Sequence, residues 1–227
     1  MSEPTSEQPH ADPRAVTSSY RSGALTEAEL APTWLAQLQN WYDQAAADPG
    51  IPEPNAMQVA TVDDAGEPDV RTVLARGFGK AGVEFYTNYD SAKGRALAAH
   101  PVAALVFSWL PLERQVRLRG PVERVSRAET ETYFAGRPRG SQLAAWASAQ
   151  SQVLQSREEL EQALAEVQRR FGAADDDPPI PPPPRWGGYR VRPVAVEFWQ
   201  GREFRLHDRL RYRLADSGHW LVERLAP

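Results

Sequence analysis

The sequence predicts an α+β protein that is mostly β, with antiparallel strands forming a barrel or sandwich and helices at its flanks. Three observations predict this fold class. Short β-like runs, each closed by a turn signal, recur through the first half of the chain. Helical patterns precede and follow that region. A second group of β-like runs then follows a proline-rich stretch near the C-terminus.

The chain begins with a segment that has no periodic pattern. Residues 1–19 are polar and contain prolines, which predicts a disordered tail. From Pro32, the residues Trp34, Leu38 and Trp41 recur at helical spacing, and three prolines in DPGIPEPN end that helix. The first predicted helix therefore lies just before the first predicted strand.

The first group of strands is predicted at AMQVATV, DVRTVLARGF, VEFYTN, PVAALVFSWL and RQVRLRGPVERV. The turns DDAGEP and GKAG separate the first three runs. A short helix, DSAKGRALAAH, follows VEFYTN, and either Asp90 or Ser91 is suited to cap it. Three further strands are expected at YRVRPVAVEFWQ, EFRLHDRLRYRL and HWLVERLAP.

Helices are predicted between the two groups of strands. Ser126 and Glu129 have the spacing of a capping box, and Pro138 interrupts the helical pattern that follows. A second amphipathic helix begins after Ser156. The acidic and proline-rich residues 173–185 are expected to form an extended crossover strap, so that residues 20–227 make a single domain.

Composition and charge exclude several classes of function. The 227-residue chain has a net charge of −4, so no overall positive field attracts nucleic acid or an anionic membrane. It has no cysteine, which excludes disulfides and Cys nucleophiles, and its four His are too scattered to suggest a metal site. No apolar run is long enough to span a membrane, and no signal-peptide pattern is present. We expect a cytoplasmic protein without nucleic-acid or membrane partners.

The run Arg205-Leu206-His207-Asp208-Arg209 is the first candidate for chemistry. As a strand it would place Arg205, His207 and Arg209 on one face, because strand side chains alternate. Burying that face would require an anionic partner such as a carboxylate or a phosphate. The alternative is a solvated face of an edge strand, which the patterning alone favours.

A second candidate combines Tyr133, Arg137 and Ser141, spaced four residues apart. A phenol, a guanidinium, a hydroxyl and the helix start after Pro138 would together suit a phosphate. The alternative is a helix surface with a coincidental arginine, and the spacing does not decide between the two.

A third candidate is the predicted strand that runs from Arg71 to Arg76, together with Tyr86, Thr87 and Lys93. These residue types near a helix N-terminus are typical of a phosphomonoester site. The chain has no glycine-rich phosphate loop of the Walker or Rossmann type, which favours FMN held by strand side chains over ATP or NAD. It also has no GxSxG or HExxH motif, so hydrolytic chemistry has no candidate residues.

From about Tyr20 to Pro227, motifs in register resemble those of the pyridoxine/pyridoxamine 5′-phosphate oxidase family. These motifs are IPEPNAM, ATVD, RTVL, FYTN, LERQVR, YFAGRPRGSQ, AWAS with QS, VEFWQG, RLHDR and ERLAP. One such motif alone is weakly specific, whereas this many in order are strongly specific.

The resemblance implies an FMN-binding split β-barrel with Greek-key-like antiparallel strands, and a homodimer with two FMN sites at the subunit interface. Its motifs assign FMN binding to Arg71, Thr72, Val73, Leu74, Arg76, Tyr86, Thr87, Lys93, Gln115, Gln150, Ser151, Trp199 and Arg209. They assign substrate binding to Arg76, Tyr133, Arg137, Ser141, Arg205 and His207, with Arg205 and His207 as the catalytic positions.

The implied activity is oxidation of pyridoxamine 5′-phosphate or pyridoxine 5′-phosphate to pyridoxal 5′-phosphate, in vitamin B6 biosynthesis and salvage. O2 would be the acceptor and H2O2 would be released. The flavin would carry the redox step, and the protein would orient the reactants. The alternatives are a phenazine-biosynthesis-type flavin oxidase, an FMN- or pyridoxal-phosphate-binding protein without turnover, and a heme- or F420-binding relative.

The chain departs from the family pattern at three places. Arg76 stands where the family usually has Lys, which keeps the charge. Ala92, in Ser91-Ala92-Lys93, stands where the family has Arg, which removes a cation expected on the FMN phosphate. The residues before Tyr20 are Thr17-Ser18-Ser19, where an Arg often stands in the family.

Overall fold

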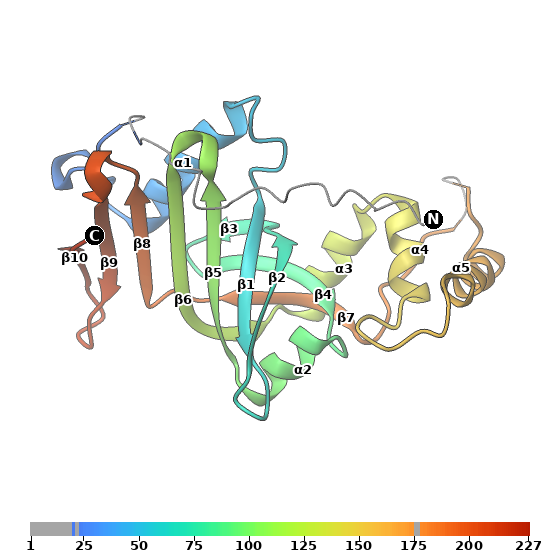
Figure 1. Cartoon of the computed structure of the whole chain (residues 1–227). Coiled ribbons are helices and arrows are strands. Elements are labelled where there is room, and N and C mark those ends of the chain that lie inside the picture. Colours follow the sequence, from blue (N-terminus) through green and yellow to red (C-terminus); the bar gives the residue numbers. More distant parts are fainter. Residues whose placement is uncertain (1–19, 21–22, 175–177) are drawn as a thin grey trace, which may run out of the picture.

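The fold is an antiparallel sheet that curls on itself, with helices on its outside and at one end (Figure 1). A computed structural model describes residues 20, 23–174 and 178–227. The predicted tail at 1–19 and the acidic residues 175–177 lie outside the described residues.

Ten strands form the sheet, and each pair of hydrogen-bonded neighbours is antiparallel. Seven of them follow the order β10-β9-β8-β6-β5-β1-β2, while β3, β4 and β7 form a branch that joins at β6. The strands are β1 (Ala56–Val62), β2 (Pro68–Leu74), β3 (Gly77–Gly79), β4 (Gly82–Asn88), β5 (Val102–Trp109), β6 (Arg114–Arg124), β7 (Trp186–Val191), β8 (Ala195–Gln200), β9 (Asp208–Leu214) and β10 (Trp220–Arg224).

The long strand β6 is where the sheet divides. Its first half pairs with β8 and its last residues, Val122 to Arg124, pair with β7. One strand therefore belongs to both sides of the curl, which is the arrangement of a split barrel. Apolar side chains from alternate positions of these strands fill the interior, among them the fully buried Phe85, Phe107 and Phe198. The predicted mostly β, split-barrel fold is confirmed.

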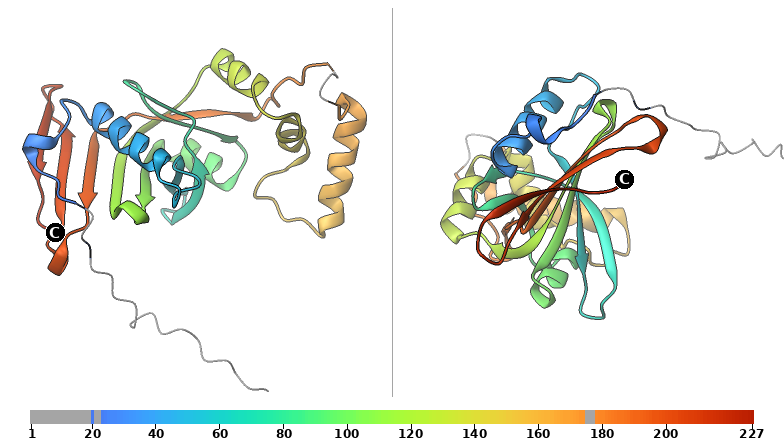
Figure 2. Two further views of the ribbon diagram at one scale, coloured as in Figure 1. Left: turned by 90° about the horizontal axis from the view of Figure 1, so that it is seen from above. Right: turned by 90° about the vertical axis from the view of Figure 1, so that its left-hand side faces the viewer.

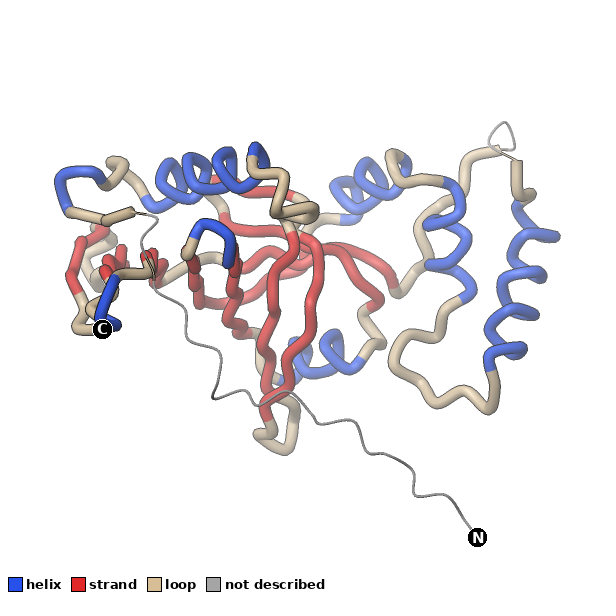
Figure 3. Tube along the Cα trace, turned by 45° about the horizontal axis from the view of Figure 1, so that its top comes forward, coloured by secondary structure: helices blue, strands red, loops and turns tan. Residues whose placement is uncertain are grey.

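Three of the helices in the described residues begin where the capping residues predict. They are α1 (Trp34–Ala47), α2 (Ala92–Ala99), α3 (Arg127–Ala135), α4 (Arg139–Ala147) and α5 (Arg157–Phe171). Ser91 caps α2, Ser126 and Glu129 form the predicted capping box of α3, and Ser156 caps α5. Figure 3 shows α1 and α2 beside the strands, whereas α3, α4 and α5 gather at one end, away from β9 and β10 (Figure 2).

Side-chain donors hold residues 178–183 of the proline-rich strap, a stretch that has no helix or strand. Arg127 donates to the carbonyl oxygens of Pro182 and Pro183, and Trp146 Nε1 donates to that of Pro181 at 2.8 Å. Proline has no N–H and cannot join a strand ladder, so its carbonyls take side-chain donors instead. These bonds tie the strap to α3 and α4.

The prediction of a strand through RLHDR is wrong for the first half of that run. Glu203–Arg205 form a 3₁₀ turn, and β9 begins only at Asp208. Phe204 and Arg205 have positive φ angles of 57° and 62°, in the left-handed region that non-glycine residues rarely adopt. Strand alternation therefore does not place Arg205, His207 and Arg209 on one face. Residue type alone gives no signal for such a backbone.

Two other predicted strands are shorter than expected. The run YRVRPVAVEFWQ is divided into β7 and β8, so the C-terminal segment has four strands rather than three. Pro193 lies in that break, where it has no N–H to give to a ladder. The strand from Arg71 ends at Leu74, so Arg76 lies beyond β2, and its backbone N–H donates to Glu84 O at 2.8 Å.

Candidate functional site

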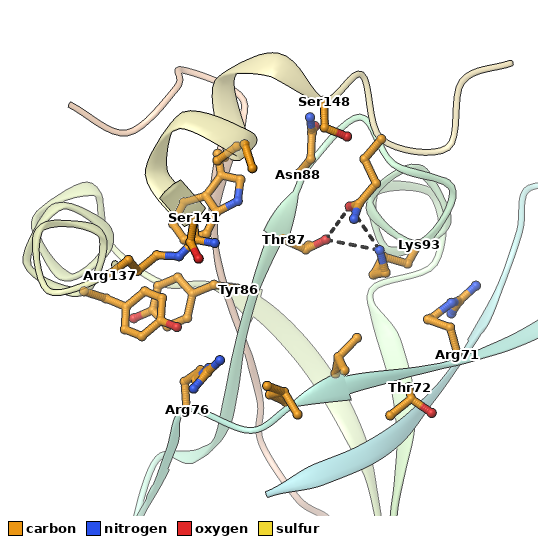
Figure 4. Close-up of a pocket in the computed structure, with 17 residues that line it drawn as sticks. Arg71, Thr72, Arg76, Tyr86, Thr87, Asn88, Lys93, Arg137, Ser141 and Ser148 are labelled. Carbon is orange, nitrogen blue, oxygen red and sulfur yellow. Dashed lines mark hydrogen bonds between the residues drawn. The ribbon is translucent and has the colours of Figure 1, made fainter. Parts of the chain in front are cut away.

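A cavity of about 540 Å³ opens between the barrel and the helices at its end (Figure 4). Strands β2 and β4 and helices α2, α3 and α4 contribute to its wall. The lining residues that were predicted from the sequence are Arg71, Thr72, Val73, Leu74, Arg76, Tyr86, Thr87, Lys93, Tyr133, Arg137, Ser141 and Gln150. The structure thus brings the second and third candidate groups into one site.

Lys93 lies at one end of this cavity. Its buried ammonium donates to Thr87 Oγ1 and Gln150 Oε1, both at 3.2 Å, and to Ser91 Oγ at 3.4 Å. Burial, and then the charge of Arg71, lower the pKa of Lys93 below the ordinary lysine value. Within the described residues no carboxylate forms an ion pair with it. A buried cation held only by neutral oxygens suits an anionic ligand.

Arg71 lies next to this end of the cavity and is anchored to its own sheet. It donates to Val59 O at 3.1 Å and to Thr61 Oγ1 at 2.7 Å, and it forms an ion pair with Asp69. These contacts fix the direction of the guanidinium from β1 and β2. Arg71 therefore adds positive charge beside Lys93, part of which Asp69 offsets.

Arg137 and Arg76 lie at the other end, on the far side of Tyr86 from Lys93 (Figure 4). Arg137 is half-buried, and its Nη1 is buried without a hydrogen-bond partner in the described structure. Burial lowers the pKa of Arg137, and the charge of Arg76 lowers it further, against the opposing influence of Tyr133. Two cations with an unused buried donor would suit a second anionic group.

Aromatic rings line the wall between the two ends. Tyr86 stacks on Tyr133 with centroids 3.9 Å apart, and both rings lie nearly parallel to Trp186. Burial raises the pKa of Tyr86 to about 12, so it stays a neutral phenol. Sequence reasoning missed Trp186, Asn88, Ala144, Ala145 and Ser148, which also line the cavity. Trp186 pairs with Asn88 between β7 and β4, and the sequence of neither strand predicts that register.

The remaining predicted residues do not line this cavity. Gln115, Trp199 and Arg209 form one row across β6, β8 and β9. His207 packs beside Trp199 with ring centroids 4.6 Å apart, and Tyr20 packs edge-on against both rings. Arg205 is exposed on the 3₁₀ turn, and Ser151 is exposed beyond the end of α4 with a positive φ of 69°.

Except for Ser151, which directly follows the cavity-lining Gln150, this second group lies on a different part of the molecule from the cavity. Figures 1 and 2 show β8, β9 and β10 at one end of the molecule and α4 toward the other. The site residues predicted from the sequence are therefore divided into two sets, which one copy of the chain does not bring together.

The residues of the cavity fit FMN. A phosphomonoester suits Lys93 and Arg71, since both are cations next to the start of α2. Strand β2 offers backbone and apolar side chains, Val73 and Leu74, along one wall for a flat ring system. Within the described residues there is no cluster of His, Asp and Glu that could hold a metal ion, and no helix is long and apolar enough to cross a membrane.

A split barrel with a cationic, aromatic-lined cavity against one end of its sheet defines a protein of the flavin-binding split-barrel class. Residues 43–171 match the family described as pyridoxamine 5′-phosphate oxidase, and residues 186–227 match the pyridoxine 5′-phosphate oxidase C-terminal dimerisation region. The chain belongs to the pyridoxamine 5′-phosphate oxidase family. It is accordingly a flavoprotein oxidoreductase with FMN as its cofactor.

Individual relatives agree with this assignment. The chain is 53% identical over 209 residues to a pyridoxine/pyridoxamine 5′-phosphate oxidase of Saccharopolyspora erythraea, covering 92% of each chain. It is 55% identical over 203 residues to that of Salinispora arenicola, covering 89% of this chain and 90% of the relative. Among solved structures, PhzG from Burkholderia lata 383, in complex with tetrahydrophenazine-1-carboxylic acid, superposes with a TM-score of 0.81 at 30% identity. The superposition covers 90% of this chain and 98% of the PhzG chain.

Proposed function

We propose that the protein is an FMN-dependent oxidase that converts pyridoxamine 5′-phosphate or pyridoxine 5′-phosphate to pyridoxal 5′-phosphate, with O2 as acceptor and H2O2 as by-product. The observation that carries this proposal is the pair of separate cationic groups in one cavity, Lys93 with Arg71 and Arg137 with Arg76. Two phosphorylated ligands, the cofactor and the substrate, need two such groups. One phosphorylated ligand would need only one.

At the Lys93 end of the cavity, the role of the chain is to bind FMN and to orient it. When bound, FMN supplies the hydride acceptor for the reaction. Lys93 and Arg71 would hold its phosphate, and Thr87, which already contacts Lys93 and Gln150, would add a hydroxyl beside them. The β2 segment from Arg71 to Leu74 would form the wall for its ring system. Lys93 is buried, so water competes weakly for this contact.

At the Arg137 end of the cavity, the role of the chain is to match the charge of the substrate phosphate and to fix the position of the substrate. Arg137 and Arg76 carry the charge that a phosphate dianion requires, and Tyr133 and Ser141 offer hydroxyl donors in the same part of the cavity. Fixing the phosphate fixes the distance of the substrate ring from the cofactor wall. A substrate without phosphate would leave the half-buried Arg137 and the exposed Arg76 without a counter-charge.

We further propose that the site is completed by a second copy of the chain. The C-terminal segment matches a dimerisation region, and it carries Trp199, Arg205, His207 and Arg209, which lie away from the cavity of their own copy. In a homodimer, this group from one copy would face the cavity of the other. The arrangement explains why the predicted site residues are divided into two sets.

In this arrangement, His207 acts as a donor. Its Nδ1 accepts a hydrogen bond from the backbone N–H of Arg202 at 3.1 Å. Because Nδ1 accepts this bond, Nε2 is the ring nitrogen left to donate to a polar group of the substrate. Arg205 lies two residues earlier on an exposed turn, where it can close over the bound ring.

Oxygen uptake tests the proposed function. The FMN-loaded protein is supplied separately with pyridoxamine 5′-phosphate, unphosphorylated pyridoxamine and a reduced phenazine precursor, and H2O2 is measured alongside. We expect turnover with the phosphorylated vitamer alone. Turnover of the phenazine precursor instead would favour the function suggested by the likeness to PhzG. No turnover with saturating FMN would contradict the oxidase and favour a binding protein.

A further inference from the structure

Arg137 differs from the part-buried Arg190 and Arg209 in what holds it. Arg190 and Arg209 each bind carboxylates, namely Glu84 and Glu129 for Arg190 and Glu197 for Arg209. Arg137 has no carboxylate partner within the described residues, and its Nη1 is buried with no hydrogen bond there. Within the described residues, therefore, no carboxylate neutralises the charge of Arg137 and no acceptor takes up its Nη1 donor.

Aromatic faces hold Arg137 instead. Its Cζ lies 4.7 Å from the centroid of the Trp186 ring and 5.5 Å from that of Phe134. A cation over a ring is attracted by the ring's quadrupole, and this attraction uses none of the guanidinium N–H groups. The ring thus orients Arg137 while its charge and donors stay available.

Trp186 is itself held firmly, so it can act as a fixed surface. The edge of Phe134 packs against it with centroids 5.0 Å apart and planes at 73°, and Tyr133 lies parallel to it within 6°. Its backbone N–H donates to Pro183 O at 3.1 Å, which ties the start of β7 to the proline-rich strap. Its side chain is buried and still reaches the wall of the cavity.

We propose that Trp186 is a positioning residue for the substrate phosphate: its indole face holds the Arg137 guanidinium at the cavity wall without a counter-ion. The inference rests on the proposed function, because it assigns that phosphate to Arg137. A carboxylate in the same place would orient Arg137 equally well but would compete with the phosphate for its charge. Trp186 thereby favours phosphorylated over unphosphorylated substrates.

Steady-state kinetics on the FMN-loaded full chain test this role. We expect Trp186→Leu to raise KM for pyridoxamine 5′-phosphate about tenfold with little change in kcat, and Trp186→Phe, which keeps a ring face, to recover most of the loss. Trp146→Leu is the matched control. That tryptophan belongs to the same apolar cluster and lies under Arg170 rather than Arg137, so KM should not change.

A double-mutant cycle separates positioning from packing. In an Arg137→Ala background, the effect of Trp186→Leu on KM should disappear, because no guanidinium remains to be positioned. An undiminished effect in that background would overturn the inference. If the Leu variant does not fold, the same cycle with Trp186→Phe gives the decision, since its smaller KM effect must also vanish without Arg137.

A failure of the proposed function is distinguishable from a failure of this inference. If the wild-type protein oxidises no vitamer, the cycle is repeated with binding of pyridoxal 5′-phosphate followed by its absorbance. Weaker binding in Trp186→Leu that depends on Arg137 would then still support the positioning role. Equal binding by wild type and both Trp186 variants would overturn it. FMN affinity, read from flavin fluorescence, should be unchanged in every variant of the cycle.

Discussion

Glu197 holds the guanidinium of Arg209 at two points, with Nε to Oε1 at 2.8 Å and Nη2 to Oε2 at 3.2 Å. Glu197 is buried on β8, and Arg117 from β6 binds the same carboxylate from the other side. Burial raises the pKa of Glu197, but the hydrogen bonds from Arg209 and Arg117 outweigh it and lower the pKa below its ordinary value. The carboxylate thus remains charged and fixes where Arg209 points.

The first prediction follows from this pair. Glu197→Gln should weaken FMN binding about tenfold, because Arg209 loses a charge-assisted partner worth about 1.5 kcal/mol. Titration of flavin fluorescence measures the change. Glu223→Gln is the matched control: Glu223 likewise lies between two arginines, Arg211 and Arg213, but neither is a predicted FMN contact. Equal weakening in both variants would mean that the sheet, rather than Arg209, was disturbed.

The second prediction concerns the buried charge of Lys93. Lys93→Met should raise the free energy of unfolding of the FMN-free protein near neutral pH by on the order of 1 kcal/mol, because it removes a buried cation that has no carboxylate partner in the described structure. The same variant should bind FMN at least about tenfold more weakly. Urea unfolding and flavin titration measure the two effects.

The pH dependence of that stability difference has a definite sign. Burial lowers the pKa of Lys93, so the folded protein releases this proton at a lower pH than the unfolded chain does. Wild-type stability should therefore rise, relative to Lys93→Met, as pH increases from the lowered pKa to the ordinary lysine pKa of about 10.4. A difference that stays constant over this range would contradict the assignment of the cost to the buried charge.

The third prediction concerns Ala92, the first residue of α2. Ala92 lines a smaller cavity of about 320 Å³ that Arg71 and Asp69 also line. Ala92→Arg should tighten FMN about tenfold or more by restoring a cation next to Lys93 and Arg71. Ala98→Arg adds the same charge to an exposed position of α2 and should have little effect. Unchanged affinity in Ala92→Arg would show that another group, such as Arg95 on the same cavity, already supplies the charge.

The fourth prediction tests the shared site. Lys93→Met and Arg209→Ala each damage a different half of the proposed site, so each homodimer alone should bind FMN weakly. When the two variants are mixed in equal amounts after reversible dissociation, about half of the dimers that form again should be heterodimers. Each heterodimer has one of its two sites with both halves intact, so the mixture should regain about a quarter of the wild-type sites. No recovery, despite heterodimers seen by native mass spectrometry, would mean that each site is built within one chain.

The sequence by itself determined the parts that depend on local chemistry. The capping residues Ser91, Ser126 and Ser156 mark helix starts because a side-chain oxygen satisfies free N–H groups one turn away. The strands β1, β4 and β5 agree with their apolar runs. The motif order also identified the family, and twelve predicted site residues line one cavity.

Only the tertiary structure decided how distant segments meet. It placed Trp186 beneath Arg137 through the pairing of β7 with β4, which nothing local in either strand specifies. It replaced the predicted strand at Arg205 with a left-handed turn, held in part by the bond from Arg202 N–H to His207. It also divided the site residues into two sets at different parts of the chain. Local patterns record the preference of each backbone segment, whereas register, crossover and subunit contacts depend on the packing of the whole chain.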